Sequence, residues 1–180
     1  MTNHAVLQAN QVASMNVDSL NRSIVSALAL DNGNIVILSG RSATAGEGEV
    51  FTAIAPSSSN GLTGVWMVNE PEVVLSSGYK GLDPDPRHFT NDIGKICSAF
   101  KPQLGDIITL TAEAFSGSKG GSDTFANATD STGGVKLVWG TSQTASVFSV
   151  KLLETTYISI ADGSIGDQRV TAYKFEVVGL

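Results

Sequence analysis

The chain has 180 residues, of which 42% are hydrophobic and only 16% charged, and it contains 19 glycines and many serines and threonines. This composition excludes a coiled coil, and it argues against disorder because the apolar content is ample. The formal net charge is −6 with 11 Lys and Arg, which argues against a nucleic-acid partner or an anionic membrane surface, since both need a basic face.

Period-two alternation dominates the chain and predicts an all-β protein. Short runs rich in β-branched residues predict strands at 34–39, 49–54, 64–68, 72–75, 106–114, 135–139, 146–153, 157–160 and 169–178. Helix is scarce, and the best candidate, 17–29, is equally well interpreted as a strand. Many short strands separated by frequent turns predict an antiparallel β-barrel or a sandwich.

Turn residues and side-chain alternation refine this expectation. Asn32-Gly33 lies between two apolar runs and predicts a hairpin turn, because Asn-Gly tolerates positive φ angles. The segment 161–167 predicts a second hairpin. Within the strands, Ile108, Leu110 and Ala112 are expected to share one face. In the last strand the expected core face is formed by Arg169, Thr171, Tyr173, Phe175 and Val177.

Three segments lack a strand pattern. Residues 1–22 are expected to form an extended N-terminal arm, followed by a β-rich domain over 23–180. Residues 76–92 predict a long loop with two prolines, and residues 116–134 a loop or linker rich in Gly and Ser. That last segment is compatible either with one barrel carrying a long excursion or with two units, 23–115 and 135–180.

Candidate catalytic residues are few, and we predict that the protein is not an enzyme. A nucleophile needs a nearby base, but His4 lies in the expected arm and His88 in a loop beside acidic residues, where a hydrogen-bonded loop histidine is the simpler interpretation. Carboxylate pairs cannot be judged from spacing among 17 acidic residues. A hydrolase that uses such a pair stays a remote alternative.

Metal and ligand motifs are equally sparse, so we expect no metal and no cofactor. The loop 162–167 offers oxygen ligands but lacks the spacing of a calcium loop. Cys97 is the single cysteine, which excludes an intrachain disulfide and a multi-cysteine metal site. Trp66 and Trp139 lie within strand patterns, so a core position is favoured over a sugar-binding platform.

Several segments point to a family. They are Glu47-Gly-Glu-Val-Phe51, Val65-Trp-Met-Val-Asn-Glu-Pro-Glu-Val-Val74, Gly81-Leu-Asp-Pro84 with Phe89, Ile93-Gly-Lys-Ile-Cys-Ser-Ala-Phe100 and Leu104-Gly-Asp-Ile-Ile-Thr-Leu-Thr-Ala-Glu-Ala114. In order and spacing they resemble the small head (capsid) decoration proteins of tailed bacteriophages, especially phages of Gram-positive hosts. The resemblance covers residues 47–114 well and the strands of 135–178 more loosely.

The resemblance implies a virion structural protein that docks on the outside of the capsid and bridges neighbouring major capsid subunits. Its expected partners are the major capsid protein and, in an oligomer, other copies of itself. Assembly would take place in the host cytoplasm, in keeping with an N-terminus that lacks a secretion signal. The alternatives are a tail or baseplate structural protein and a carbohydrate-binding β-module.

Two regions are the leading candidates for capsid contact. The arm 1–22 could add a strand to a partner's sheet edge. The loop 76–92 carries Tyr79, Leu82 and Phe89, which we single out as capsid anchors because two prolines and two glycines stiffen their loop. The alternative for the same loop is that it folds back and plugs one end of the barrel.

Overall fold

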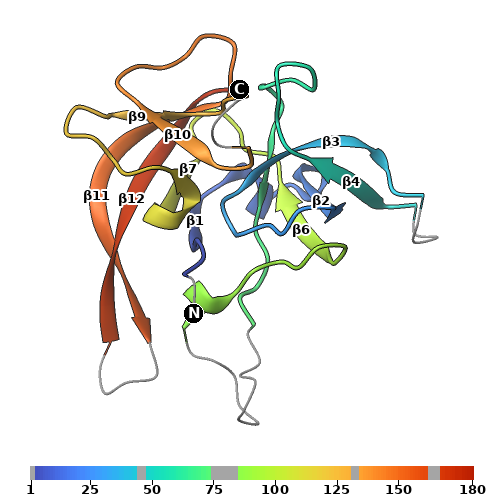
Figure 1. The fold of residues 1–180 in the computed structure, drawn as a ribbon, viewed down its shortest axis with the longest axis horizontal. Helices are drawn as coiled ribbons and strands as arrows, with labels where there is room; N and C mark the ends of the chain where they lie inside the picture. Colours follow the sequence, from blue (N-terminus) through green and yellow to red (C-terminus); the bar gives the residue numbers. More distant parts are fainter. Residues whose placement is uncertain (1–2, 44–47, 74–84, 131–133, 162–166) are drawn as a thin grey trace.

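The structure is a computed structural model that describes residues 3–43, 48–73, 85–130, 134–161 and 167–180. It confirms the all-β prediction and contains a closed five-stranded barrel and a seven-stranded sheet (Figure 1). The strands are β1 (Leu7–Gln11), β2 (Asn21–Ser26), β3 (Ile35–Arg41), β4 (Val50–Ile54), β5 (Trp66–Val68), β6 (Ile96–Phe100), β7 (Ile107–Thr111), β8 (Phe115–Ser116), β9 (Phe125–Asn127), β10 (Leu137–Gly140), β11 (Ser149–Ala161) and β12 (Asp167–Gly179). Its helical elements are short 3-10 turns: η1 (Ala13–Met15), η2 (Asp18–Leu20), η3 (Pro86–His88) and η4 (Ala112–Ala114).

The chain passes from the sheet into the barrel and back again. The barrel has the order β2-β4-β3-β5-β6 and closes where β6 pairs with β2, whereas the sheet has the order β1-β7-β12-β11-β9-β10-β8. Figure 1 shows the sheet on the left and the barrel on the right. The barrel is therefore formed by residues 21–100, between the first and second strands of the sheet.

This division differs from the predicted units 23–115 and 135–180. The segment 116–134, expected as a linker, holds the end of β8 and all of β9. β9 pairs with both β10 and β11, and its Ala126 is fully buried. A strand with neighbours on both sides belongs to the sheet, so the two units meet near residues 101–106 rather than at the Gly/Ser-rich segment.

The expected N-terminal arm is also corrected, because from His4 onward it contacts the folded domain, beginning with the His4 N–H that donates to the Arg87 carbonyl at 2.7 Å. β1 pairs antiparallel with β7, placing Leu7 opposite Leu110. Val6 and Leu7 are buried, and the Val6 N–H donates to Thr111 Oγ1 at 3.0 Å. Burial of these apolar side chains and closure of the β7 edge hold the segment in place.

A single carboxylate joins the two crossings between sheet and barrel. Asp106 is buried, and its Oδ1 accepts a hydrogen bond from the Ala13 N–H at 3.0 Å on the way into the barrel. Its Oδ2 accepts from the Gln103 N–H at 2.8 Å on the way out. Beside it, the Lys101 N–H donates to the Leu20 carbonyl at 2.8 Å, so the two crossings lie together.

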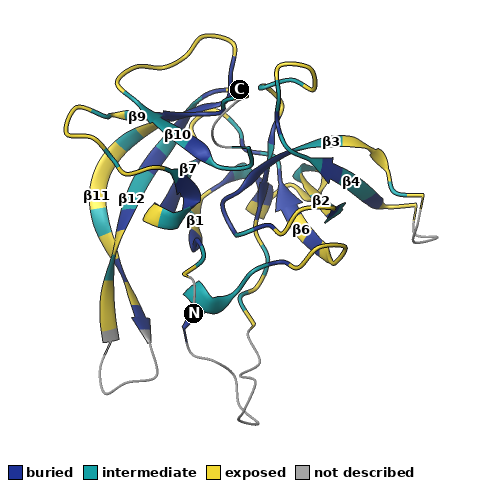
Figure 2. Ribbon diagram, viewed as in Figure 1, coloured by how far each residue is buried: buried dark blue, intermediate teal, exposed yellow. Residues whose placement is uncertain are grey.

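The main hydrophobic core lies between barrel and sheet. Ile35, Met67 and Phe100 from the barrel are buried in one cluster with Leu110 and Phe175 from the sheet. Figure 2 shows this buried region where the barrel and the sheet meet. A second cluster, around Ile24, Val36 and Cys97, fills the barrel. The shared cluster makes barrel and sheet parts of one packed body.

The Asn32-Gly33 prediction is half right. The tight turn forms, with Gly33 at φ +84° and the Asn34 N–H donating to the Asp31 carbonyl at 3.1 Å. The flanking strands β2 and β3 do not pair with each other, because each pairs with β4 instead. The hairpin expected around 161–167 is confirmed by the pairing of β11 with β12, although its tip lies outside the described residues.

The positions of the strands are predicted better than the faces that the strands bury. The runs 146–153 and 157–160 prove to be one strand, β11, and 17–29 contains the strand β2, whereas Glu72 and Val73 are not in a strand. Phe175 and Val177 are buried as expected, but Arg169 and Thr171 are exposed while Ala172 is buried. The face of β12 that is buried changes along the strand, because Ala172 packs with Ile158 and Ile160 in a small separate cluster.

Candidate functional site

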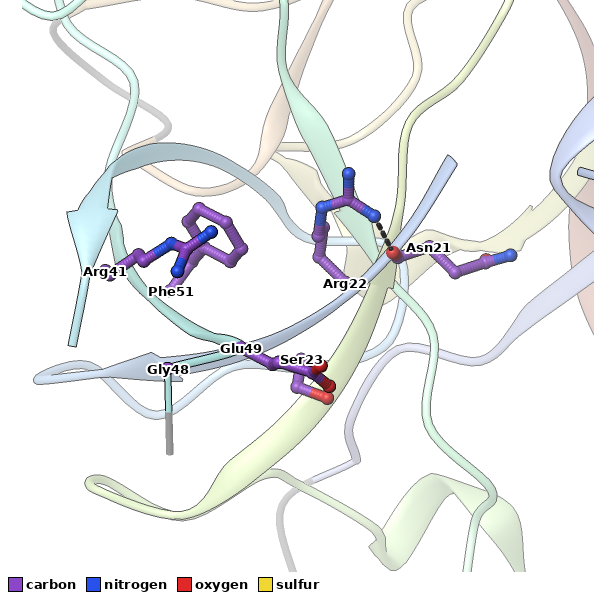
Figure 3. Close-up of a pocket in the computed structure, with 7 residues that line it drawn as sticks. All are labelled: Asn21, Arg22, Ser23, Arg41, Gly48, Glu49 and Phe51. Atoms are coloured by element: carbon purple, nitrogen blue, oxygen red, sulfur yellow. Dashed lines mark hydrogen bonds between the residues drawn. The ribbon is translucent and has the colours of Figure 1, made fainter. Parts of the chain in front are cut away.

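A pocket of about 360 Å³ lies in the barrel wall, where the start of β2, the end of β3 and the start of β4 come together (Figure 3). It is lined by Asn21, Arg22, Ser23, Arg41, Gly48, Glu49 and Phe51. We call it the arginine pocket. Its residues come from three strands and from the turn before β4, and their order in the chain gives no sign that they meet.

Strand pairing explains how the arginine pocket forms. β2 and β4 run parallel with Ile24 opposite Phe51, and β3 runs antiparallel to β4 with Arg41 opposite Phe51. A bulge in β3 between Leu38 and Gly40 shifts the register by one residue. Without that bulge Arg41 would lie opposite the buried Val50, so the bulge aims the Arg41 side chain at the pocket.

Arg22 is held in a defined position. Its Cζ lies 5.9 Å from the centre of the Phe51 ring and 5.7 Å from the centre of the Trp66 ring, within the range of cation–π attraction. Its Nη1 donates to the Asn21 carbonyl at 2.7 Å. Because a guanidinium has five N–H donors, most of them stay available to a ligand.

The charges of the arginine pocket do not cancel. Among the described lining residues Glu49 is the one acid, and within the described part of the chain neither arginine forms an ion pair. The described lining residues therefore carry a formal net charge of about +1 in a protein whose net charge is −6. Ser23 is exposed and adds a hydroxyl group to the lining.

The predicted anchor Phe89 lines a larger hollow of about 680 Å³. It is half-buried there, next to His88 and Thr90, and Glu70 and Ile96 form other parts of the lining. The two other predicted anchors, Tyr79 and Leu82, lie outside the described residues. The structure therefore places one of the three anchors at a surface depression and does not describe the other two.

The segment that precedes Phe89 is fixed by an ion pair. Asp85 is buried and accepts from the backbone N–H of Arg87 at 2.9 Å and from its Nη2 at 2.7 Å. This hydrogen bonding by the Arg87 guanidinium holds the pKa of Asp85 below its ordinary value. Arg87 Nη2 also donates to Gln168 on β12 at 2.7 Å, which links η3 to the sheet.

Each of the two histidines lies near an aspartate, but the two arrangements differ. His4 Nδ1 is 2.7 Å from Asp31 Oδ1, and the Thr90 hydroxyl donates to the same oxygen at 3.0 Å. His88 Nε2 is 3.9 Å from Asp85 Oδ2. In the first group the carboxylate, rather than the imidazole, lies in the middle, so His4 is not placed to take a proton from Thr90.

Both tryptophans are half-buried. Trp139 stacks on Phe115 with ring centres 4.4 Å apart and meets Tyr173 edge-on at 5.0 Å. Trp66 packs against the barrel core, and Arg22 lies over its ring. One surface of Trp139 still lines a pocket of about 250 Å³ with Lys119. These contacts favour the core interpretation over a sugar-binding platform.

A further surface is formed by the outer part of the β11–β12 hairpin. We call residues 153–161 of β11 and 167–171 of β12 the β-ribbon. β9 pairs with β11 only at Ser149–Lys151, so among the described strands the outer edge of β11 has no neighbour along the ribbon. Leu153 and Tyr157 are 46% and 57% exposed on it. Figure 1 shows the ribbon projecting beyond the rest of the sheet.

Among the described residues, no group of three or more His, Cys, Asp or Glu side chains comes together in a way that could hold a metal ion. Nor is any described helix long and apolar enough to cross a membrane.

No family model, curated protein or solved structure matches the chain. The arginine pocket and the β-ribbon are therefore identified by geometry alone. Sequence reasoning missed both. Neither Arg22 nor Arg41 lies in a motif, and the free edge of β11 depends on the short length of β9.

Proposed function

We propose that the chain is a virion structural protein that binds the outside of a tailed-phage capsid and stabilises contacts between major capsid subunits. The observation that carries the proposal is the β-ribbon, which projects from the sheet with a β11 edge that no described strand pairs with and with exposed apolar side chains. The proposal is also supported by the resemblance of residues 47–114 to head decoration proteins.

An exposed strand edge suits this task because its backbone N–H and C=O groups can pair with a strand of a partner. Leu153 and Tyr157 supply apolar area along the same strand, and Arg169 lies 5.2 Å from the Tyr157 ring centre, which fixes that ring. On a capsid lattice the contact would recur at every site. Modest affinity at each site would then suffice to stabilise the shell.

The proposed contact region differs from the one expected from the sequence. Residues 4–22 are engaged within the domain, with β1 paired to β7, so they do not form a free extended arm. We therefore propose the β-ribbon as the surface that pairs with a strand of the capsid. Phe89, which lines its own hollow, stays a second candidate contact. A location on the tail or baseplate would use the same surfaces and is distinguished by where the protein sits on the particle.

The experiment is cosedimentation of the purified protein with undecorated capsids of tailed phages of Gram-positive hosts, followed by electron microscopy of the particles. We expect stoichiometric density at repeating lattice positions, with the β-ribbon facing the shell. Absence of binding to capsids, or density on tails alone, would refute the proposal.

Matched variants test the β-ribbon itself. Leu153→Glu and Tyr157→Glu should each weaken capsid binding about tenfold or more, because they place a charge in an apolar contact. Leu104→Glu is the control, since Leu104 is 64% exposed but lies between barrel and sheet, away from the ribbon. Equal weakening by Leu104→Glu would show that surface charge, rather than the ribbon, governs binding.

A further inference from the structure

We propose that the arginine pocket is a receptor for a single carboxylate side chain on an acidic segment of a partner protein. The pocket brings two guanidinium groups to one concave site of about 360 Å³ that is open to solvent. Guanidinium groups bind carboxylates with paired, charge-assisted hydrogen bonds. This inference goes beyond capsid binding and holds whether or not the chain is a virion protein.

The arginine pocket is pre-organised for a ligand. Arg22 is fixed before any ligand arrives, because Phe51 and Trp66 lie under its guanidinium and Asn21 accepts one of its N–H groups at 2.7 Å. An arginine that is already ordered loses little conformational freedom on binding. Figure 3 shows Arg41 beside Phe51, with Arg22 on the other side of the ring.

The charge of the pocket points to the same class of ligand. The described residues offer Arg22 and Arg41 no ion-pair partner, although Glu49 lines the same pocket. Among the described lining residues, two positive charges and one negative charge leave a net charge of about +1, which one carboxylate neutralises. A phosphate dianion would overshoot that balance and be repelled by Glu49. The pocket therefore favours a monoanion.

The lining of the pocket also indicates what carries the carboxylate. An acidic sugar would use an aromatic ring as a stacking platform, but Phe51 is the one aromatic residue among the described lining residues, and Arg22 already lies over its ring. The lining is otherwise polar, with Ser23 and Gly48 at the surface. An Asp or Glu side chain needs only the two guanidinium groups and a polar surround, so a protein segment fits best.

The test is a titration of the full chain, followed by NMR of the arginine side-chain resonances. The probes are a short acetylated peptide with a central Glu, inorganic phosphate, and galacturonic acid. We expect saturable shifts of Arg22 and Arg41 with the peptide, at least threefold tighter binding than with either other probe, and weaker binding as salt is raised. Tighter binding of phosphate or of galacturonic acid would overturn the assignment.

Variants make the test specific. Arg22→Gln and Arg41→Gln should each weaken peptide binding at least fivefold, and the exposed Arg41 keeps the test open if Arg22→Gln reduces stability. Lys119→Gln is the matched control, because the Lys119 ammonium group also lies over an aromatic ring, that of Trp139, but outside the arginine pocket. Glu49→Gln should shift the preference toward phosphate severalfold. Peptide binding that survives both Arg22→Gln and Arg41→Gln would refute the proposal.

Discussion

In the barrel every strand has two neighbours, because β6 returns to pair with β2, whereas in the seven-stranded sheet the end strands β1 and β8 each have one. β11 adds a further open edge along the β-ribbon. A closed barrel has no free backbone edge, so it can offer a partner only side chains, as in the arginine pocket. An open sheet can offer its backbone as well. The two halves thus suit two different kinds of contact.

The largest effect is expected from removing β1, which covers the β7 edge of the sheet. Deletion of residues 1–11 removes the buried Val6 and Leu7 and should lower the free energy of unfolding by roughly 4 kcal/mol or more. Urea denaturation measures this loss. Val17→Ala, at a position 42% exposed, is the control and should change stability by less than about 0.5 kcal/mol. An unchanged midpoint after the deletion would mean that the segment is an independent arm after all.

The next effect is expected at the joint between the two halves. A Cβ on Gly33 would lie 2.4 Å from Cδ2 of Leu110, which is fully buried, so the Leu110 side chain would have to shift within the core. Gly33→Ala should therefore cost about 3 kcal/mol, from overpacking together with a φ of +84°. Gly94→Ala is the matched control, with φ +73° and nothing within 4 Å, and should cost about 1 kcal/mol. Equal costs would show that conformation alone matters.

A smaller effect tests how well the barrel interior excludes water. Burial, with a smaller contribution from the Glu70 carboxylate, raises the pKa of Cys97 to about 11. At pH 8 its thiolate fraction, and so its labelling by a disulfide reagent, should be roughly 100-fold lower than in the unfolded chain. Labelling at the unfolded rate would mean that the barrel opens freely.

The same cysteine predicts a pH dependence of stability. Because its pKa is higher in the folded chain than the ordinary 9.0, its contribution is complete below pH 9 and is lost as the pH rises to about 11. Urea midpoints at pH 8 and at pH 10.5, compared between the natural chain and Cys97→Ala, measure this loss. The natural chain should lose more stability than the variant, and equal losses would contradict the prediction.

The smallest effect is expected in the sheet, at the surface pair formed by Glu154 and Lys174. Lys174 Nζ lies 2.6 Å from Glu154 Oε1, but both side chains are substantially exposed. A double-mutant cycle with Glu154→Gln and Lys174→Gln should give a coupling energy of about 0.5 kcal/mol or less. A coupling above 1 kcal/mol would mean that this cross-strand pair, at the base of the β-ribbon, is far more rigid than its exposure suggests.

The parts of the fold that the sequence predicts are those set by local rules. Alternation places most strands, and Asn32-Gly33 forms its tight turn because the turn depends on two neighbouring residues. The pairing of the strands does not follow in the same way. β2 and β3 lie before and after that turn, yet both pair with β4. This pairing buries Ile24 and Val36 inside the barrel.

The candidate sites were less predictable for the same reason. Arg22 and Arg41 are brought together by a parallel strand pair and a bulge, neither of which leaves a sequence signal. The segment 1–22 was misjudged because its buried residues, such as Val6 and Val12, are separated by polar ones that face solvent at a sheet edge. Edge strands of this kind carry few apolar residues and so resemble an arm.

Asp106, whose two oxygens tie together the entry and the exit of the barrel, has a consequence for how this architecture can change. A chain that leaves and re-enters a sheet at one point can carry an inserted module there with little cost in loop entropy. The barrel is therefore an inserted module that another module could replace. A substitute would have to supply side chains equivalent to Ile35, Met67 and Phe100, because the sheet relies on them to complete its core.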